Sequence, residues 1–229
     1  LSGEANLSVG GTIYLGDEGG SGTFDQSDTA GLEVAGRLVI GTNSETGSNS
    51  PSTGILTQDG GTTMVGADLV LGEYAGTKGT YNLYSGDLYV DGWVIVGNYG
   101  QGDVHQSGGS VTLTGGSSDL YLGRYPGGSG RYEMDGGDLS VGWFYVGWYG
   151  TSDFVQDGGT VTVSHEMNVG TEFGSYGTYG ISGESVLDAG GATIYVGRMA
   201  GSIGSFNQGG GTVTADWMDV GSEGRGVLT

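Results

Sequence analysis

The chain is built from one short unit that recurs nine times. Each unit holds a strand of alternating apolar residues that ends in a glycine, and these glycines follow one another at intervals of 23–27 residues, with a single interval of 31. A period of this length is the signature of a repeat architecture, in which each unit buries its apolar face against its neighbours. The nine anchor glycines are Gly16, Gly41, Gly72, Gly97, Gly123, Gly147, Gly170, Gly197 and Gly221.

The strand before each anchor glycine carries two apolar columns. The residues one and three positions before the glycine are apolar in all nine units, as Val96 and Val94 are before Gly97. Positions i and i+2 of a strand share a face, so both columns are predicted to point inward.

A second strand follows each anchor glycine and has its own two inward columns. The first is aromatic or aliphatic, and in the second, glutamine interchanges with leucine, methionine and isoleucine. An inward glutamine must be hydrogen-bonded, and stacked amides or the backbone of the following Gly-Gly turn are the expected partners. The first column consists of Phe24, Leu56, Tyr81, Val104, Tyr132, Phe154, Tyr179, Phe206 and Leu228, and the glutamines are Gln26, Gln58, Gln106, Gln156 and Gln208.

A Ser/Asp-Gly-Gly turn then leads to a third strand, as Asp157-Gly158-Gly159 leads to Val161 and Val163. Residues 62–67 and 185–191 fit this third strand less well. Three short strands and three turns predict an all-β fold: a parallel, right-handed, three-sided β-solenoid of nine coils, with 23–27 residues per coil. The one long interval predicts a solvated loop insertion at 42–53. Residues 1–229 are expected to form a single solenoid domain.

Composition and charge exclude several classes of protein. Gly makes up 54 of 229 residues, but Pro only 2 and aromatics 10%, which excludes collagen and a disordered linker. The absence of cysteine excludes disulfides and thiolate metal sites. The formal charge of −20 argues against nucleic-acid partners, and the lack of a long apolar run argues against membrane insertion.

The two ends of the sequence match in phase. If Thr229 is followed by Leu1, then Leu228 and Leu1 fall into the two inward columns of the second strand, and Ser2-Gly3 becomes its turn. Because no capping segment is recognisable, both ends are expected to be uncapped, and the chain is expected to stack on itself head to tail or to be a window of a longer repeat. The predicted interface consists of Leu1, Ser2, Gly3, Val227, Leu228 and Thr229.

The pattern V-G, then G-G-x-[FY]-x-Q-[SD]-G-G-x-V-x-V, is clearest in 100–123 and 150–170. It resembles the short repeats of bacterial autotransporter (type V secretion) passengers and of surface proteins sorted by PEP-CTERM signals. The resemblance covers all nine units and implies a secreted or cell-surface β-solenoid. It implies neither a cofactor nor a particular activity.

Aromatic residues are the main candidates for lateral contacts or for binding surface glycans. One follows the anchor glycine at the same corner in five successive units, and others are predicted to face outward from the anchor strand. Stacking between coils, which would stabilise the ladder itself, is the competing interpretation. The candidates are Tyr74, Tyr99, Tyr125, Tyr149, Phe173, Trp93, Tyr121, Trp143, Tyr145, Tyr195 and Trp217.

Catalytic and metal sites are not expected. His105 and His165 fall in different coils, and the corner carboxylates are spread out rather than paired with cations as an inverting glycosidase or a lyase would require. An acidic corner allows at most weak Ca²⁺ binding, because no D-x-D-x-D-G spacing is present. The sequence therefore predicts no enzyme and no cofactor. It predicts an extracellular structural protein of a bacterial surface filament, with a glycan-binding adhesin as the alternative.

Overall fold

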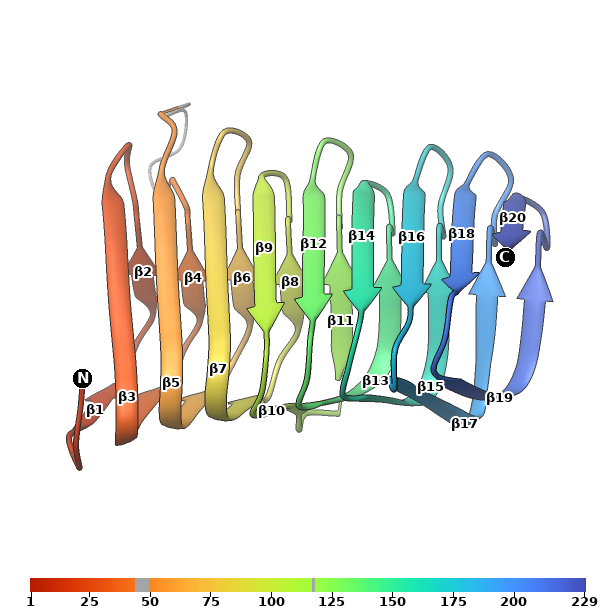
Figure 1. The fold of residues 1–229 in the computed structure, drawn as a ribbon. Helices are drawn as coiled ribbons and strands as arrows, with labels where there is room; N and C mark the ends of the chain where they lie inside the picture. Colours follow the sequence, from red (N-terminus) through yellow and green to blue (C-terminus); the bar gives the residue numbers. More distant parts are fainter. Residues whose placement is uncertain (44–49, 117) are drawn as a thin grey trace.

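The computed structural model describes residues 1–43, 50–116 and 118–229. These residues form an all-β, parallel β-solenoid of about nine coils and contain no helix (Figure 1). The strands are β1 (Asn6–Val9), β2 (Ile13–Leu15), β3 (Ser21–Val34), β4 (Leu38–Ile40), β5 (Thr53–Val65), β6 (Leu69–Leu71), β7 (Lys78–Val90), β8 (Val94–Val96), β9 (Gln101–Gln106), β10 (Ser110–Leu113), β11 (Asp119–Leu122), β12 (Ser129–Met134), β13 (Asp138–Val146), β14 (Thr151–Gln156), β15 (Thr160–Val169), β16 (Tyr176–Ile181), β17 (Val186–Val196), β18 (Ile203–Gln208), β19 (Thr212–Val220) and β20 (Arg225–Leu228).

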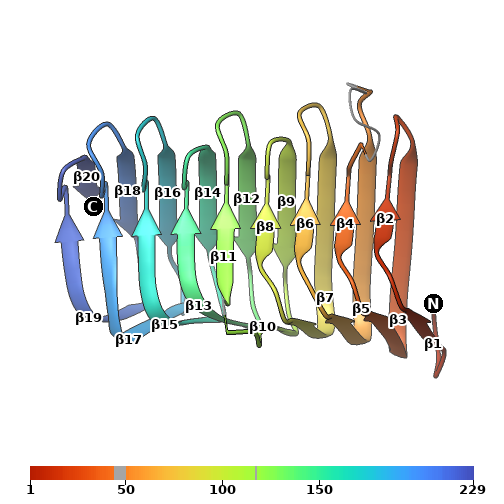
Figure 2. The same ribbon diagram turned by 180° about the vertical axis from the view of Figure 1, so that it is seen from behind.

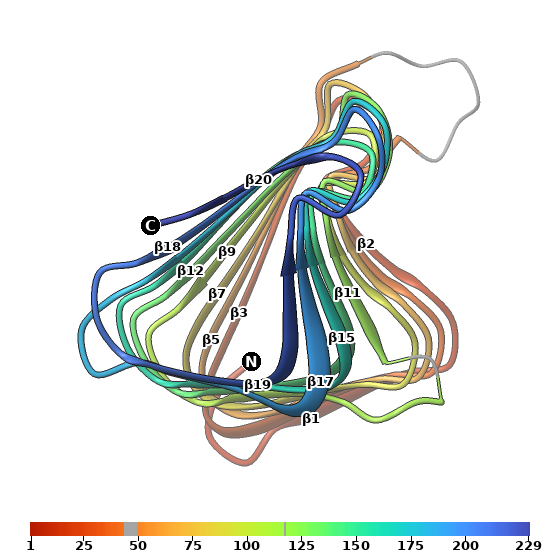
Figure 3. The same cartoon turned by 90° about the vertical axis from the view of Figure 1, so that its right-hand side faces the viewer.

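Seen along its axis, the solenoid has three sides (Figure 3). The anchor face holds β2, β4, β6, β8, β11 and the last parts of β13, β15, β17 and β19, and Figure 2 shows it from the front. The second face holds β9, β12, β14, β16, β18, β20 and the first parts of β3, β5 and β7. The third face holds the remaining segments. The chain descends the second face, crosses the third and rises along the anchor face as it advances, so the coil is right-handed (Figure 1).

Register along the rod follows the predicted columns. On the anchor face Val94 and Val96 lie between Leu69 and Leu71 of the coil before and Leu120 and Leu122 of the coil after. On the second face Phe154 pairs with Tyr132 and Tyr179, and its ring stacks on both at 4.9 Å. Like residues therefore form inward ladders, and these ladders make one continuous core.

The anchor glycines are required by the backbone. All nine adopt positive φ, between +59° at Gly123 and +79° at Gly147. This left-handed conformation suits glycine because it has no Cβ to clash with the following peptide. Every coil has one such glycine at the end of its anchor strand. The chain therefore leaves the anchor face at the equivalent position in each coil, which keeps the coils in register.

Two expectations need correction. The second and third strands are not always separate: in β3, β5 and β7 pairing with the neighbouring coil continues around the corner with only local register shifts. The two stretches that fitted poorly are also paired, since Thr62 opposes Asp87 and Val186 opposes Thr212.

The insertion at 42–53 is less solvated than predicted. Thr42, Asn43 and Ser52 are buried, and the Ser52 hydroxyl donates to the Asn43 side chain over 2.7 Å. Residues 44–49 of the predicted loop lie outside the described residues. Pairing on either side of the insertion is undisturbed, because Ser21 opposes Thr53 and Leu38 opposes Leu69.

Candidate functional site

The first coil presents the N-terminal residues in the register that the sequence predicts. The Leu1 amino group donates to the Asp25 carbonyl over 2.7 Å, and the Ser27 amide donates to the Leu1 carbonyl over 2.9 Å. These two bonds place Leu1 beside Gln26, in the glutamine column. The Ser2 carbonyl then accepts the Ala5 amide, which forms the predicted turn at Ser2-Gly3.

The last coil places Val227, Leu228 and Thr229 in the complementary positions. Val227 pairs with Ser205 and Leu228 with Phe206. Thr229 continues the ladder, since its amide donates to the Phe206 carbonyl over 3.0 Å and its carbonyl accepts the Gln208 amide over 2.7 Å. The C-terminal strand thus stops one position before the column that Leu1 occupies at the other end.

Both end coils expose members of the core columns. Leu228 is 52% exposed and Leu7 is 37% exposed, whereas their equivalents in the interior coils are buried. Within the described residues, β1 and β2 pair only with the coil after them, and β19 and β20 only with the coil before them. Each end therefore presents open strand edges and apolar side chains that a further coil would cover.

The inward glutamines connect successive coils through a repeated set of hydrogen bonds. The Gln106 Nε2 donates to the Gly109 carbonyl of its own turn over 3.3 Å and to the Asp138 carbonyl of the next coil over 3.1 Å. Its Oε1 accepts the hydroxyl of Tyr132, also in the next coil, over 2.5 Å. The expected turn backbone is confirmed as a partner, but the tyrosine hydroxyl was missed.

The same arrangement recurs at Gln58 with Tyr81 and at Gln156 with Tyr179. The sequence signal that could have found it is a covariation between columns. Every inward tyrosine in the first column of the second face comes one coil after a glutamine in the second column. Where the second column instead holds Leu83, Met134 or Ile181, the next coil has Val104, Phe154 or Phe206 in the first column.

Gln208 lacks part of this set. Its Nε2 donates to the Gly211 carbonyl over 3.3 Å, but it has no second acceptor among the residues that the structure describes. For Gln58, Gln106 and Gln156 the second acceptor is the backbone carbonyl of the residue that begins the third strand of the next coil. These carbonyls belong to Asp87, Asp138 and Val186, respectively.

The aromatic candidates do not form one exposed ladder. Tyr99 and Tyr125 stack at 4.6 Å between ring centroids, and Tyr74 and Tyr149 are exposed without stacking on them. Glu172, and not Phe173, stands two residues after its anchor glycine. Phe173 lies one position further along and is 79% exposed.

On the outward side of the anchor face the aromatic residues form a cluster of their own. Tyr121 is only 5% exposed, because Tyr145 and Trp148 stack on it at 4.8 and 4.7 Å and Trp93 meets its edge at 5.9 Å. Its hydroxyl donates to Asp119 over 2.7 Å. We call Trp93, Tyr121, Tyr145 and Trp148, with Arg124 among them, the outer cluster.

The other aromatic candidates lie elsewhere on this face. Trp143 is half-buried and stacks on His165 at 4.1 Å, and Tyr195 carries the guanidinium of Arg198 at 4.4 Å from its ring centroid. Trp217, in the last coil, is 68% exposed. Arg124 and Trp148, which lie one residue after their anchor glycines, are central to the outer cluster but were not among the sequence candidates.

Burial shifts the acid–base behaviour of the outer cluster. Loss of solvent raises the pKa of the Asp119 carboxyl, while its hydrogen bond from Tyr121 and the charge of Arg124 act in the opposite direction. Burial, together with the adjacent Asp119, raises the pKa of the Tyr121 hydroxyl far above its usual value.

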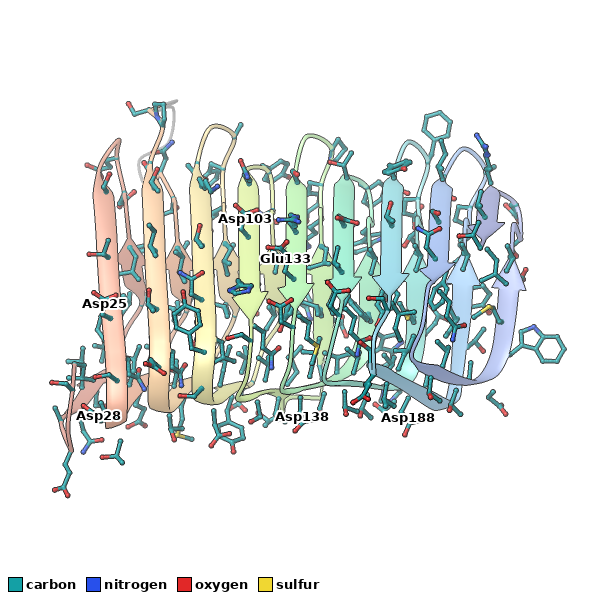
Figure 4. The ribbon with its side chains drawn as sticks, in the orientation of Figure 1. Asp25, Asp28, Asp103, Glu133, Asp138 and Asp188 are labelled. Carbon is teal, nitrogen blue, oxygen red and sulfur yellow. The ribbon has the colours of Figure 1, made fainter. Side chains whose placement is uncertain are left out.

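The carboxylates are distributed along the rod. Figure 4 shows Asp25, Asp103 and Glu133 on the second face and Asp138 and Asp188 along the lower edge; only Glu133 and Asp138 of these five share a coil. His105 pairs with Asp135 over 2.9 Å at the surface. In the described ranges no three His, Cys, Asp or Glu side chains gather where they could hold a metal ion.

None of the described segments is a helix long and apolar enough to cross a membrane. No protein-family model, curated protein or solved structure matches this chain.

Proposed function

We propose that the chain is a structural part of an extracellular bacterial surface filament, a solenoid rod that further coils of the same kind extend at both ends. Those coils come from a second copy stacked head to tail or from continuing polypeptide. The proposal assigns the protein no catalytic step. Its resemblance to autotransporter and PEP-CTERM repeats supports export to the cell surface.

The observation that carries the proposal is the incomplete hydrogen-bonding set of Gln208. Asp87, Asp138 and Val186 occupy equivalent positions in the third strands of their coils. Followed toward the N-terminus, the same column passes through Gly31 and ends at Asn6 in the first coil. If a second copy is stacked on the last coil, its Asn6 carbonyl takes the place of the missing acceptor. The Gln208 Nε2 then has two acceptors, as the glutamine Nε2 groups of the interior coils have.

The end strands support the same arrangement. In the stack, Leu1 of the second copy follows Thr229 in one strand and lies beside Gln208, as it lies beside Gln26 within its own chain. Leu7 of the second copy covers the apolar columns of the last coil. Because the two surfaces differ, the contact is heterologous and produces an open filament.

Electron microscopy and light scattering of the purified 229-residue chain test the proposal. We expect rods one solenoid wide with an axial repeat of about 43 Å, since each of nine coils adds ~4.8 Å. Leu228→Lys, which places a charge in the buried stack, should leave single dispersed particles. Trp217→Lys is the matched control, because it adds the same charge to the same coil on its outward side. Dispersed wild-type particles at high concentration, or rods of Leu228→Lys, would contradict the stacking of separate copies.

The second candidate function is an adhesin that binds surface glycans through its aromatic side chains. The half-buried Trp93 and Trp143 favour it, because sugars stack on indole rings. Glycan binding that Trp93→Ala and Trp143→Ala abolish would support this function, and lack of binding to any glycan would count against it.

A further inference from the structure

Three of the six cationic side chains lie on the outward side of the anchor face, and two of them are ion-paired. Arg37 contacts Glu73 at 2.6 Å, and Arg198 contacts Glu166 at 2.5 Å. The guanidinium of the third, Arg124, makes no ion pair and no hydrogen bond with any residue in the described part of the chain, and its Nε is buried. Arg225, exposed in the last coil, is the one other cationic side chain for which the described residues show no ion pair.

Aromatic rings take the place of a carboxylate around Arg124. Its guanidinium carbon lies 4.6 Å from the ring centroid of Trp93, 4.9 Å from Tyr125, 5.3 Å from Tyr121 and 5.9 Å from Trp148. The faces of these rings attract a cation but offer no lone pair to its N–H groups. The guanidinium is therefore held in position while its hydrogen-bonding capacity is left unused.

Two other polar atoms on neighbouring segments of this face also lack partners. Asn98 Oδ1 and Asp119 Oδ1 are buried without a hydrogen bond, and with Arg124 Nε they are three of the six such atoms in the described ranges. Asn98 and Arg124 each follow an anchor glycine directly, in adjacent coils, and Asp119 lies on the strand that leads to Arg124. Buried polar atoms in native proteins are nearly always hydrogen-bonded, so the residues around Arg124 leave its guanidinium short of polar partners.

We infer that the outer cluster binds a sugar that carries a single carboxylate. The planar guanidinium of Arg124 is suited to two parallel hydrogen bonds from one carboxylate. The half-buried rings of Trp93 and Trp148 provide surfaces for stacking a sugar ring. The overall negative charge repels polyanions, which selects an isolated acidic sugar within a neutral glycan.

The inference rests on the second candidate function and is tested with two ligands that differ in one sugar. Xylotriose is neutral, and glucuronosyl-xylotriose adds one carboxylate. Titration calorimetry and tryptophan fluorescence of the whole chain should show binding of the acidic ligand at least tenfold tighter than that of xylotriose. Arg124→Met should lower the affinity for the acidic ligand at least tenfold, while Arg198→Met, which removes an ion-paired arginine from the same face, should leave it unchanged.

The outcomes separate the two proposals. If both ligands bind equally, the glycan-binding function stands but the role of Arg124 is wrong; if neither binds, both are wrong. Circular dichroism shows whether Arg124→Met is folded. Arg124→Lys keeps the charge among the rings but loses the planar pair of donors, so it should retain part of the preference for the acidic ligand. An equal loss in Arg124→Met and Arg198→Met would overturn the inference.

Discussion

Near the start of the second face, most coils carry a second glycine that packs on the corner of the preceding coil. Eight of the nine coils have glycine here, and at Gly177 an added Cβ would overlap the carbonyl oxygen of Val146. The exception is Ser152, which is buried and whose hydroxyl has no hydrogen-bond partner. This residue departs from the repeat and leaves a buried polar atom unsatisfied.

Ser152→Gly should leave the free energy of unfolding unchanged or raise it slightly. Removing an unsatisfied hydroxyl stabilises by about 1–3 kcal/mol, while glycine loses ~0.5–1 kcal/mol through backbone entropy. The reverse change, Gly177→Ser, should destabilise by at least ~1–3 kcal/mol because it overpacks the same corner. Urea unfolding of both variants measures the difference, and a strongly destabilised Ser152→Gly would refute this account.

Five tyrosines should resist ionisation while the chain is folded. Burial raises the pKa of Tyr145 to about 12, and those of Tyr81, Tyr121, Tyr132 and Tyr179 still further above their usual value near 10. Because the folded state keeps protons that the unfolded state releases, stability is full below pH ~10 and falls as the pH rises above it. Ultraviolet titration should show these hydroxyls ionising only as the protein unfolds, and early ionisation of all tyrosines would exclude it.

At the scale of the element, the second face alternates polar and apolar contacts between coils. Glutamine–tyrosine pairs join some coils, and purely apolar pairs such as Met134 with Phe154 join others. Either kind leaves no buried polar group without a partner. A glutamine followed by an apolar residue needs another donor: Gln26 is followed by Leu56, and the Thr63 hydroxyl donates to its Oε1 over 3.1 Å.

Gln156 and Tyr179 should therefore be strongly coupled. Gln156→Leu leaves the Tyr179 hydroxyl without a partner and removes the Nε2 bonds to the Gly159 and Val186 carbonyls, and Tyr179→Phe leaves the glutamine oxygen without its donor, so each should destabilise by ~1–3 kcal/mol. The double variant resembles the natural Met134–Phe154 interface and should lose less than the sum of the two. A double-mutant cycle measured by denaturant unfolding tests this, and additive losses would mean that the pair is not a unit.

The sequence predicted the columns and their register because an in-register solenoid repeats its sequence pattern directly in space. It predicted that Gln106 faces inward, but not its bond to Tyr132, because the partner is chosen by side-chain reach between coils rather than by periodicity. It could not foresee that Tyr121 is covered. Alternation tells which side of a strand a residue occupies, whereas burial here depends on Trp148 folding back from the corner.

At the scale of the whole molecule, stacking works against charge. The chain carries a formal charge of −20, and acidic residues lie on both end coils, among them Glu4 and Asp25 at one end and Asp216 and Glu223 at the other. Two such ends repel each other before their apolar columns meet. The strength of this repulsion depends on ionic strength, because the Debye length shrinks from about 30 Å at 0.01 M salt to about 10 Å at 0.1 M.

Filament growth should therefore accelerate with added salt. Light scattering of the purified chain should rise severalfold faster in 0.3 M than in 0.02 M NaCl, because screening removes the repulsion between ends while the buried contact is apolar. Trp217→Lys, which adds a positive charge beside the last coil, should reduce this dependence. Growth that slows with salt would show that ion pairs, rather than apolar columns, hold the ends together.

The longest coil shows where this architecture tolerates variation. Its extra residues enter directly after Gly41, yet the strands on both sides keep their partners, with Thr53 opposite Ser21 and Leu69 opposite Leu38. The corner after an anchor glycine is thus separate from the ladders that hold the rod. Foreign peptides grafted at nine such corners would be displayed in a straight row about 4.8 Å apart. The solenoid could therefore serve as a scaffold that presents ligands at a fixed spacing.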